Sequence, residues 1–260
     1  MAPEPDPTQF LDLALAMADA ASPIVMGYFR GDLEIEAKSD LSPVTAADRE
    51  AETAMRDLIE AAHPDHGIYG EEHGKVRIEA EYVWVLDPID GTMSFVTGKP
   101  LFGTLIGLVR NGVPILGIID APAMGERWVG MTGHQTTFNG KPVWARACDK
   151  LDHAWLYATS PDMFKGAEVK SFNHLRGKCR RTVFGADCYA YGLLANGTVD
   201  LVCEAALEPY DFIALAPVIK GAGGFITTWE GDEVTLRAGS RVLAAGDVHI
   251  HEAALEMLGA

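Results

Sequence analysis

Two aspartates end a run of apolar residues in the segment WVLDPIDGT, residues 84–92. Asp87 and Asp90 lie three positions apart, with Pro88 between them, at the end of a predicted buried strand, so both carboxylates can face one point. Two carboxylates about 4 Å apart repel each other by roughly 4 kcal/mol at an effective dielectric constant of about 20, and a divalent cation removes that conflict. Because the segment holds no histidine or cysteine, its oxygen ligands favour Mg²⁺ or Mn²⁺ over Zn²⁺.

The residues that follow the aspartates favour an anion. Gly91 lets the backbone approach a ligand closely, and Thr92 opens a predicted helix whose free N–H groups attract negative charge. The segment therefore predicts a cation site next to a phosphate site. The alternative interpretation is structural: Asp90 caps the helix by accepting hydrogen bonds from backbone amides.

Acidic residues elsewhere in the chain also follow predicted strands or open predicted helices. They are Glu71 and Glu72 in YGEEHG and Asp211 in EPYDFIALAP. For Asp211 the alternative is a charge in the first helical turn that complements the helix dipole. Asp48 in SPVTAADRE has a similar alternative as a partner in a helix cap, and Lys38 taken alone is typical of a solvated surface lysine.

The elements that must position these residues divide the chain into two parts. Residues 1–146 predict two amphipathic helices, at 8–30 and 46–62, followed by a mostly antiparallel sheet with a hairpin turned at Asn139-Gly140. The strands expected in this part cover residues 82–86, 102–109, 115–119 and 126–131.

The second part, residues 147–260, alternates shorter strands and helices, which is typical of a layered α/β unit. Its expected strands cover residues 155–158, 181–184, 199–203, 225–229 and 242–245. Its expected helices cover residues 164–175, 188–195 and 212–221.

The composition sets limits on location and partners. Acidic residues outnumber basic ones 37 to 21, which gives a formal charge of −16 with no Lys/Arg-rich stretch, so neither nucleic acid nor an anionic membrane is an expected partner. Four cysteines without CxxC spacing, and a start that lacks the basic region of a secretory signal, predict a reduced cytoplasmic protein. No apolar run approaches the roughly 20 residues that span a bilayer.

Taken together, the motifs resemble the inositol monophosphatase family of metal-dependent phosphatases. The resemblance covers roughly residues 8–258 and is carried by Lys38, Asp48 in SPVTAADRE, Glu71 in YGEEHG, Asp87, Asp90 and Thr92 in DPIDGTMSF, and Asp211 before a helix ending in GAGG. It implies a layered αβαβα sandwich of the sugar-phosphatase type, the fold of inositol monophosphatase and fructose-1,6-bisphosphatase. It also implies a homodimer.

The resemblance further implies a role for each motif position. Mg²⁺ ions, with Mn²⁺ as a substitute, would be held by Glu71, Asp87, the carbonyl of Ile89, Asp90 and Asp211. Asp48 and Thr92 would orient the attacking water with help from Glu71, and the backbone amides of Gly91 and Thr92 would receive the phosphate. The implied reaction is hydrolysis of a small phosphate monoester.

The substrate has to be argued from residues around the leaving group. Glu204 lies seven positions before Asp211, where inositol-directed members carry an acidic residue that contacts the ring, so it does not separate the candidates. Asp187 in GADCYAYGLLANG replaces a small residue of those members, and a carboxylate there gains roughly 1.5 to 3 kcal/mol from a hydrogen bond to an ammonium group. The alternative for Asp187 is the N-cap of the helix that follows.

Several longer segments look most like the histidinol-phosphatase branch of the family, among them IDAPAMGERWVG and ATSPDMF. Histidinol phosphate, which carries an amine, is therefore the first expected substrate. Inositol 1-phosphate, or a broad range of small phosphate esters, is the second. A scaffold that kept the fold and lost turnover is the third interpretation, although every expected ligand position holds a competent residue.

Overall fold

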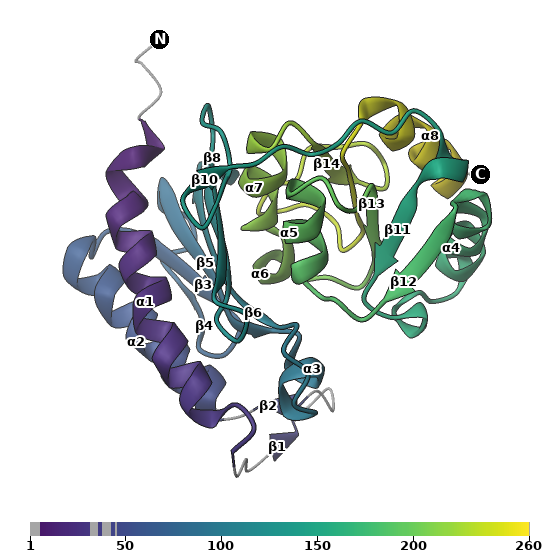
Figure 1. The fold of residues 1–260 in the computed structure, drawn as a ribbon. Coiled ribbons are helices and arrows are strands. Elements are labelled where there is room, and N and C mark those ends of the chain that lie inside the picture. Colours follow the sequence, from purple (N-terminus) through teal and green to yellow (C-terminus); the bar gives the residue numbers. More distant parts are fainter. Residues whose placement is uncertain (1–5, 32–35, 38–42, 45, 260) are drawn as a thin grey trace.

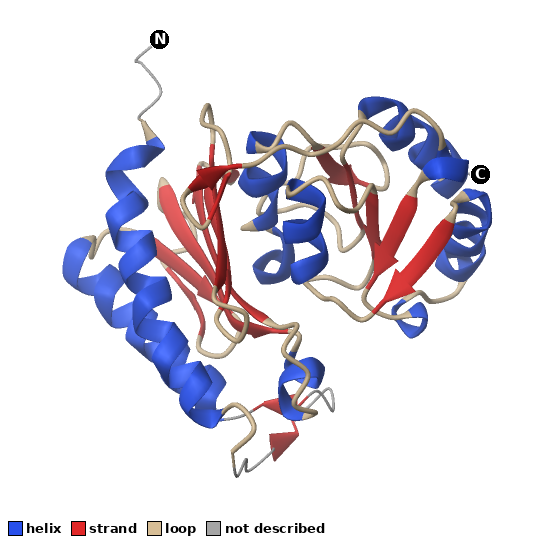
Figure 2. Ribbon diagram, in the orientation of Figure 1, coloured by secondary structure: helices blue, strands red, loops and turns tan. Residues whose placement is uncertain are grey.

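The structure is a computed structural model that describes residues 6–31, 36–37, 43–44 and 46–259. Two β-sheets alternate with three layers of helices in the order helix, sheet, helix, sheet, helix (Figure 1, Figure 2). This layering confirms the α/β sandwich that the sequence predicts. Lys38, one of the motif residues, lies outside the described residues.

The first helical layer is formed by α1 (Leu11–Tyr28) and α2 (Ala46–Ala62), which lie side by side on the larger sheet (Figure 1). The helix expected from residue 8 begins instead as a 3₁₀ helix, η1 (Pro7–Phe10), before α1. The cap of η1 is Asp6, whose carboxylate accepts a hydrogen bond from the amide of Thr8 at 3.0 Å. An aspartate ahead of a proline is a frequent helix start, so this boundary was visible in the sequence.

The segment Pro7–Tyr28 meets the length and hydropathy of a membrane span by composition alone, which corrects the expectation that no segment is long enough. In the structure α1 packs against α2 and the larger sheet. Ala14, Met17, Ala18 and Val25 are completely buried there. A core helix meets the same criterion as a membrane span, so the resemblance to a span is weak evidence for a membrane.

The larger sheet has the strand order β10-β9-β8-β7-β6-β5-β3-β4 and is antiparallel except where β3 pairs with β5. The hairpin expected at Asn139-Gly140 is confirmed, because both residues have the positive φ angles, 47° and 75°, that such a turn requires. The strands of the larger sheet are β3 (Gly67–Gly70), β4 (Gly74–Val76), β5 (Tyr82–Asp90), β6 (Gly103–Arg110), β7 (Val113–Ala121), β8 (Glu126–Met131), β9 (Thr137–Phe138) and β10 (Lys141–Pro142). Two short strands, β1 (Glu36–Ala37) and β2 (Pro43–Val44), pair with each other.

The middle layer lies between the two sheets (Figure 1) and is formed by α5 (Tyr189–Ala195), α6 (Pro209–Phe212) and α7 (Leu215–Gly221). The single helix expected over residues 212–221 is thus two helices. Helix α7 approaches the larger sheet so closely that a Cβ on Gly117 would lie 1.9 Å from the carbonyl oxygen of Ala214. Glycine at this position therefore serves the packing of the middle layer on the sheet.

The smaller sheet has the order β12-β11-β13-β15-β14, with β11 (Trp155–Ala158), β12 (Arg181–Phe184), β13 (Leu201–Glu204), β14 (Phe225–Thr228) and β15 (Val242–Ala245). The outer helical layer contains α4 (Ala167–Lys178) and α8 (Val248–Leu258), with short 3₁₀ helices η2 (Leu151–His153) and η3 (Pro161–Met163) nearby in the chain. The helix expected over residues 164–175 begins and ends three residues later in the structure, as α4. Helix α8 was missed, although Asp247 as its cap and Ile250, Ala254 and Leu258 on one buried face are visible signals.

Candidate active site

Strand β5 is buried on both faces, which explains its continuous apolar run. Trp84 and Leu86 pack with α1 and α2, whereas Val83 and Val85 belong to the core between the sheets. Because side chains alternate along a strand, Asp87 points toward the middle layer, the side of Val83 and Val85. The buried strand therefore delivers a carboxylate into the interior between the sheets.

A β-bulge sets the direction of Asp90. The aspartates are three positions apart, but their partners on β6, Leu105 and Gly103, are only two positions apart. The extra residue in β5 turns Asp90 to the same face as Asp87. The strand expected over residues 82–86 is longer in the structure: β5 continues through Pro88 to Asp90, and the bulge brings the two carboxylates to one face.

The third member of the cluster comes from the middle layer. Helix α6 lies against β5 and carries Asp211 in its first turn. One carboxylate oxygen from each of Asp87, Asp90 and Asp211 falls within 4.8 Å of the others. The convergence of Asp211 with the two aspartates of β5 is the arrangement that the resemblance to the family implies.

The structural alternatives for Asp90 and Asp211 have different outcomes. The N-cap of α3 (Thr92–Val96) is Gly91, not Asp90, and Asp90 Oδ2 instead accepts a hydrogen bond from the amide of Cys188 at 2.6 Å. Asp211 does complete a capping box, since its Oδ2 accepts from the amide of Glu208 at 2.7 Å. Capping occupies one oxygen of Asp211 and leaves the other for the cluster.

Glu71 and Asp48 complete the set of acidic residues from the first half of the chain. Glu71 follows β3, its amide donates to the carbonyl of Leu86 at 3.1 Å, and its carboxylate shares a hydrogen bond with Asp87. Asp48 lies in the first turn of α2, where its side chain is 1 % exposed. Glu71 is thus in contact with the cluster, and Asp48 is buried on a helix that packs against β5.

Burial and mutual repulsion disfavour ionisation of the clustered carboxyl groups. Desolvation raises the pKa of Asp87 well above its usual range, with further contributions from Glu71 and Asp90. Desolvation also raises the pKa of Asp90, although the Cys188 amide opposes the shift. The pKa of Asp211 rises to about 8, again mainly through desolvation. A cation stabilises such a group in its ionised form, so the donor set fits a divalent metal.

The phosphate side of the motif has the expected local structure. Gly91 has a φ of 83°, a left-handed conformation that favours glycine, and α3 begins at Thr92. The Thr92 hydroxyl donates to the carbonyl of Ile89 at 3.1 Å, and the Ile89 amide donates to Asp87 Oδ1 at 3.0 Å. These bonds fix the backbone between the two aspartates.

Asp187 lies directly over this turn. A Cβ on Gly91 would be 2.9 Å from the Asp187 carboxyl carbon. Helix α5 begins with Cys188 as its N-cap and without a side-chain cap, so the capping alternative for Asp187 is wrong. Its Oδ2 accepts instead from the hydroxyl of Ser94 at 2.9 Å, a contact that the sequence gave no means of predicting. Burial raises the pKa of Asp187, and the Ser94 bond partly offsets this shift.

Glu204 lies at the end of β13 and is 4 % exposed. Its carboxylate accepts from the amide of Thr159 at 2.9 Å, from the Thr159 hydroxyl at 2.5 Å and from the Tyr191 hydroxyl at 2.9 Å. Burial raises its pKa to about 7, while these hydrogen bonds lower it. The carboxylate is therefore held rigidly, and its surroundings do not separate the candidate substrates.

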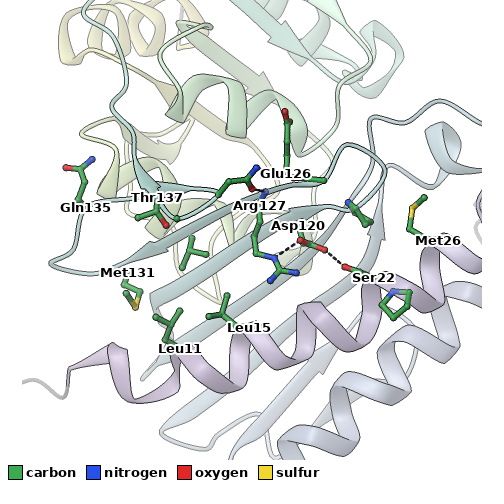
Figure 3. Close-up of a pocket in the computed structure, with 16 residues that line it drawn as sticks. Leu11, Leu15, Ser22, Met26, Asp120, Glu126, Arg127, Met131, Gln135 and Thr137 are labelled. Atoms are coloured by element: carbon green, nitrogen blue, oxygen red, sulfur yellow. Dashed lines mark hydrogen bonds and ion pairs between the residues drawn. The ribbon is translucent and has the colours of Figure 1, made fainter.

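A cavity of about 760 Å³ lies between α1 and the outer strands of the larger sheet, and Figure 3 shows the residues that line it. Leu11, Leu15 and Met131 line it, and Asp120 in its wall accepts hydrogen bonds from Ser22 and Arg127 (Figure 3). None of the clustered carboxylates lines this cavity. We therefore place the candidate active site at the cluster and not in the cavity.

Residues 6–259 match the sequence profile of the inositol monophosphatase family. The chain belongs to the inositol monophosphatase family. This family member is 51 % identical over 259 residues to the bifunctional phosphatase IMPL2, chloroplastic, of Arabidopsis thaliana, in an alignment that covers 96 % of this chain and 75 % of the plant protein. It is 34 % identical over 226 residues to a histidinol-phosphatase of Chlorobaculum parvum, with 86 % of this chain and 87 % of that protein covered.

The fold of this inositol monophosphatase family member also matches solved structures. An inositol monophosphatase from Zymomonas mobilis superposes with a TM-score of 0.91 at 45 % sequence identity, covering 99 % of this chain and 100 % of that chain. A structure named Thermotoga maritima IMPase superposes with a TM-score of 0.85 at 27 % identity, covering 96 % and 97 %. Family membership supports a metal-dependent phosphatase that acts on small phosphate monoesters.

Proposed function

We propose that this protein is a Mg²⁺-dependent phosphatase that hydrolyses L-histidinol phosphate to L-histidinol and inorganic phosphate. The observation that carries the proposal is the convergence of Asp87, Asp90 and Asp211 beside the glycine that opens α3. The cluster provides a site for divalent cations, and the cations give an acidic protein a local attraction for an anionic ester. Relatives named histidinol-phosphatase support the choice of substrate.

The proposed metal ligands are the carboxylates of Glu71, Asp87, Asp90 and Asp211 and the carbonyl of Ile89. Carboxylate and carbonyl oxygens are the donors that Mg²⁺ prefers, and Mn²⁺ accepts the same set. When bound, the metal lowers the pKa of a coordinated water and neutralises charge on the phosphate.

The protein's own groups orient the reactants in this proposal. Asp48 and the Thr92 hydroxyl hold the attacking water in line with the phosphorus atom, and Glu71 assists by accepting its proton. The backbone amides of Gly91 and Thr92 donate hydrogen bonds to the phosphate oxygens. Water attacks phosphorus, the bond to the ester oxygen breaks, and the leaving alkoxide takes up a proton.

Asp187 is the residue that we assign to substrate choice. Ser94 binds its Oδ2, so Oδ1 is the oxygen that we assign to the ammonium group of histidinol phosphate. Glu204, at the end of β13 in the smaller sheet, is the second proposed substrate contact. The runner-up substrate is inositol 1-phosphate, because the Zymomonas structure is named an inositol monophosphatase.

The test is the release of inorganic phosphate from L-histidinol phosphate and from myo-inositol 1-phosphate, each with Mg²⁺ and with EDTA. We expect Mg²⁺-dependent release from both or from the first alone, with the higher kcat/KM for histidinol phosphate. A higher kcat/KM for inositol 1-phosphate would select the runner-up. No release from any monoester would select the scaffold interpretation.

A variant pair separates charge from shape at Asp187. Asp187→Asn keeps the size of the side chain and an oxygen for Ser94 but removes the charge, so it should raise KM for histidinol phosphate more than KM for inositol 1-phosphate. Asp187→Ala should show the same difference. Equal effects on the two substrates would remove the reason for preferring the amine.

The oligomeric state and the cellular location are further parts of the proposal. We propose a homodimer in the cytoplasm. Light scattering after size-exclusion chromatography tests the first, and a monomer at micromolar concentration would contradict it.

A further inference from the structure

Helix α2 carries a buried carboxylate, Glu52, that the proposed reaction does not use. Its side chain is 0 % exposed. Glu52 lies four residues after Asp48, so the two acidic side chains leave the same face of α2 one turn apart. A buried carboxylate is retained only where hydrogen bonds or an opposite charge compensate for its lost hydration, so its partners indicate what it holds.

The partners of Glu52 are in the turn that joins β3 to β4. Its Oε2 accepts a hydrogen bond from the amide of Glu72 at 2.7 Å, and its Oε1 accepts from the amide of His73 at 3.2 Å. Arg56 pairs with Oε1 at 2.6 Å and also donates to the carbonyl of Gly74. The Glu52–Arg56 pair therefore binds residues 72–74, the end of the turn and the first residue of β4, to one helix.

Close contact at Gly70 ties the same carboxylate to the end of β3. A Cβ on Gly70 would lie 1.9 Å from Glu52 Oε1. The glycine that begins the GEEHG motif is thus required because a carboxylate occupies the space of a side chain. Glu52 fits against the turn on both sides of Glu71, at Gly70 and at Glu72.

Glu71 is held from the opposite direction by β5. Its amide donates to the carbonyl of Leu86 at 3.1 Å, directly before Asp87, and its carboxylate shares a hydrogen bond with Asp87. The backbone of Glu71 therefore lies between two fixed supports, the strand that carries the aspartates and the carboxylate of Glu52. Loss of either support gives the Glu71 side chain freedom to leave the cluster.

We propose that Glu52 is a positioning residue that fixes the turn so that the Glu71 carboxylate stays at the metal cluster. Glu52 acts through Glu71 and touches neither metal nor substrate. The inference rests on the proposed function, in which Glu71 is a metal ligand. The competing explanation is that Glu52 only fastens α2 to the β3–β4 turn and affects stability alone.

The test is a measurement of the Kd for Mn²⁺ in the absence of substrate. Electron paramagnetic resonance monitors the concentration of free Mn²⁺ during the titration. Glu52→Gln removes the charge and leaves one acceptor oxygen where two are used, so at least one amide of the turn loses its partner. We expect the Kd for Mn²⁺ to rise about tenfold or more, the range found when outer partners of metal ligands are changed. At saturating metal, KM for the phosphate ester should change by less than about threefold.

A matched control lies on the same helix. Glu60→Gln makes the same chemical change two turns further along, where the carboxylate pairs with Arg77 at the surface. This control should bind Mn²⁺ as the unchanged protein does. Glu52→Asp keeps the charge, but its shorter side chain withdraws the carboxylate from the turn. If Glu52→Gln does not fold, the Kd of Glu52→Asp for Mn²⁺ tests the positioning role in its place.

Glu71→Gln separates the two ways in which the experiment can fail. If Glu71→Gln weakens Mn²⁺ binding while both folded Glu52 variants bind within twofold of the unchanged protein, the positioning role is wrong and the proposed function stands. If Glu71→Gln leaves Mn²⁺ binding unchanged, the ligand role of Glu71 is wrong, and the inference about Glu52 is overturned with it. A lower melting temperature of a Glu52 variant with an unchanged Kd would support the purely structural explanation.

Discussion

Binding of Mg²⁺ to the metal-free protein should release protons near neutral pH. The cause is the raised pKa of the clustered carboxyl groups, to about 8 for Asp211 and well above the usual range for Asp87 and Asp90. A group with a pKa of about 8 is roughly nine-tenths protonated at pH 7, so Asp211 alone should release about one proton when a cation binds. The repulsion among the carboxylates makes each further ionisation harder, so the cluster releases its protons as a coupled set.

The assay is calorimetric titration of the metal-free protein with MgCl₂ at pH 7 in two buffers of different ionisation enthalpy, such as Tris and PIPES. The slope of the observed enthalpy against the buffer ionisation enthalpy gives the number of protons released. We expect about one or more at pH 7 and a smaller number at pH 9, where Asp211, with its pKa of about 8, is already mostly ionised. Asp211→Asn should lower the release at pH 7 if the variant still binds the ion.

The same shifts fix the direction of the pH dependence of stability. A carboxyl group whose pKa is higher in the folded state favours the folded state most at low pH, and that contribution is lost as the pH rises toward the folded value near 8. In EDTA, the contribution of the cluster to stability should therefore decline between about pH 4 and pH 8. With Mg²⁺ the decline should be smaller, so the difference in melting temperature between Mg²⁺ and EDTA should be larger at pH 8 than at pH 6.

Two results would refute this reasoning. Equal enthalpies in the two buffers, with clear Mg²⁺ binding, would mean that the carboxylates are ionised before the metal arrives. A metal effect on the melting temperature that is larger at pH 6 than at pH 8 would have the wrong sign.

Three further predictions concern single side chains. Asp90→Asn should lower turnover by orders of magnitude while the far-ultraviolet circular dichroism spectrum stays unchanged, and turnover like that of the unchanged protein would contradict its role as a ligand. Gly117→Ala should lower the free energy of unfolding by about 1–3 kcal/mol or more in urea titrations, because its Cβ would meet the Ala214 carbonyl at 1.9 Å. Gly27→Ala, in the last turn of α1 with nothing within 4 Å of its Cβ, is the matched control and should gain roughly 0.5–1 kcal/mol. Ser94→Ala removes the hydroxyl that binds Asp187 and should raise KM for histidinol phosphate about 2- to 10-fold with kcat little changed, whereas an unchanged KM would mean that Asp187 keeps its position unaided.

Local signals in the sequence were sufficient for most elements and for the pair Asp87 and Asp90, but not for the place of Asp211 in the cluster. The apolar run before Asp87 predicts a buried strand, and the glycine and threonine after Asp90 predict a helix start, as the structure confirms. The motifs of the family add that the segments of Glu71 and Asp211 meet this strand. The closeness of Asp87, Asp90 and Asp211 was therefore predictable from the sequence together with the resemblance to the family.

Features that depend on pairing between strands or on contacts between distant segments were not predictable in this way. The β-bulge that aligns Asp87 with Asp90 is defined by the register of β6, which the sequence of β5 does not contain. The Ser94–Asp187 bond joins residues 93 positions apart. Glu52 has the appearance of one more charged residue on an amphipathic helix until the turn after β3 is placed against it.

The most direct test of the account is a crystal of the protein grown in MnCl₂ and measured for anomalous scattering from manganese. We predict an anomalous peak within coordination distance of Asp87, Asp90 and Asp211, with Glu71 or the carbonyl of Ile89 as a further ligand. A well-ordered cluster without a peak at saturating Mn²⁺, or a peak only at another place in the molecule, would contradict the central claim that these carboxylates form a divalent metal site.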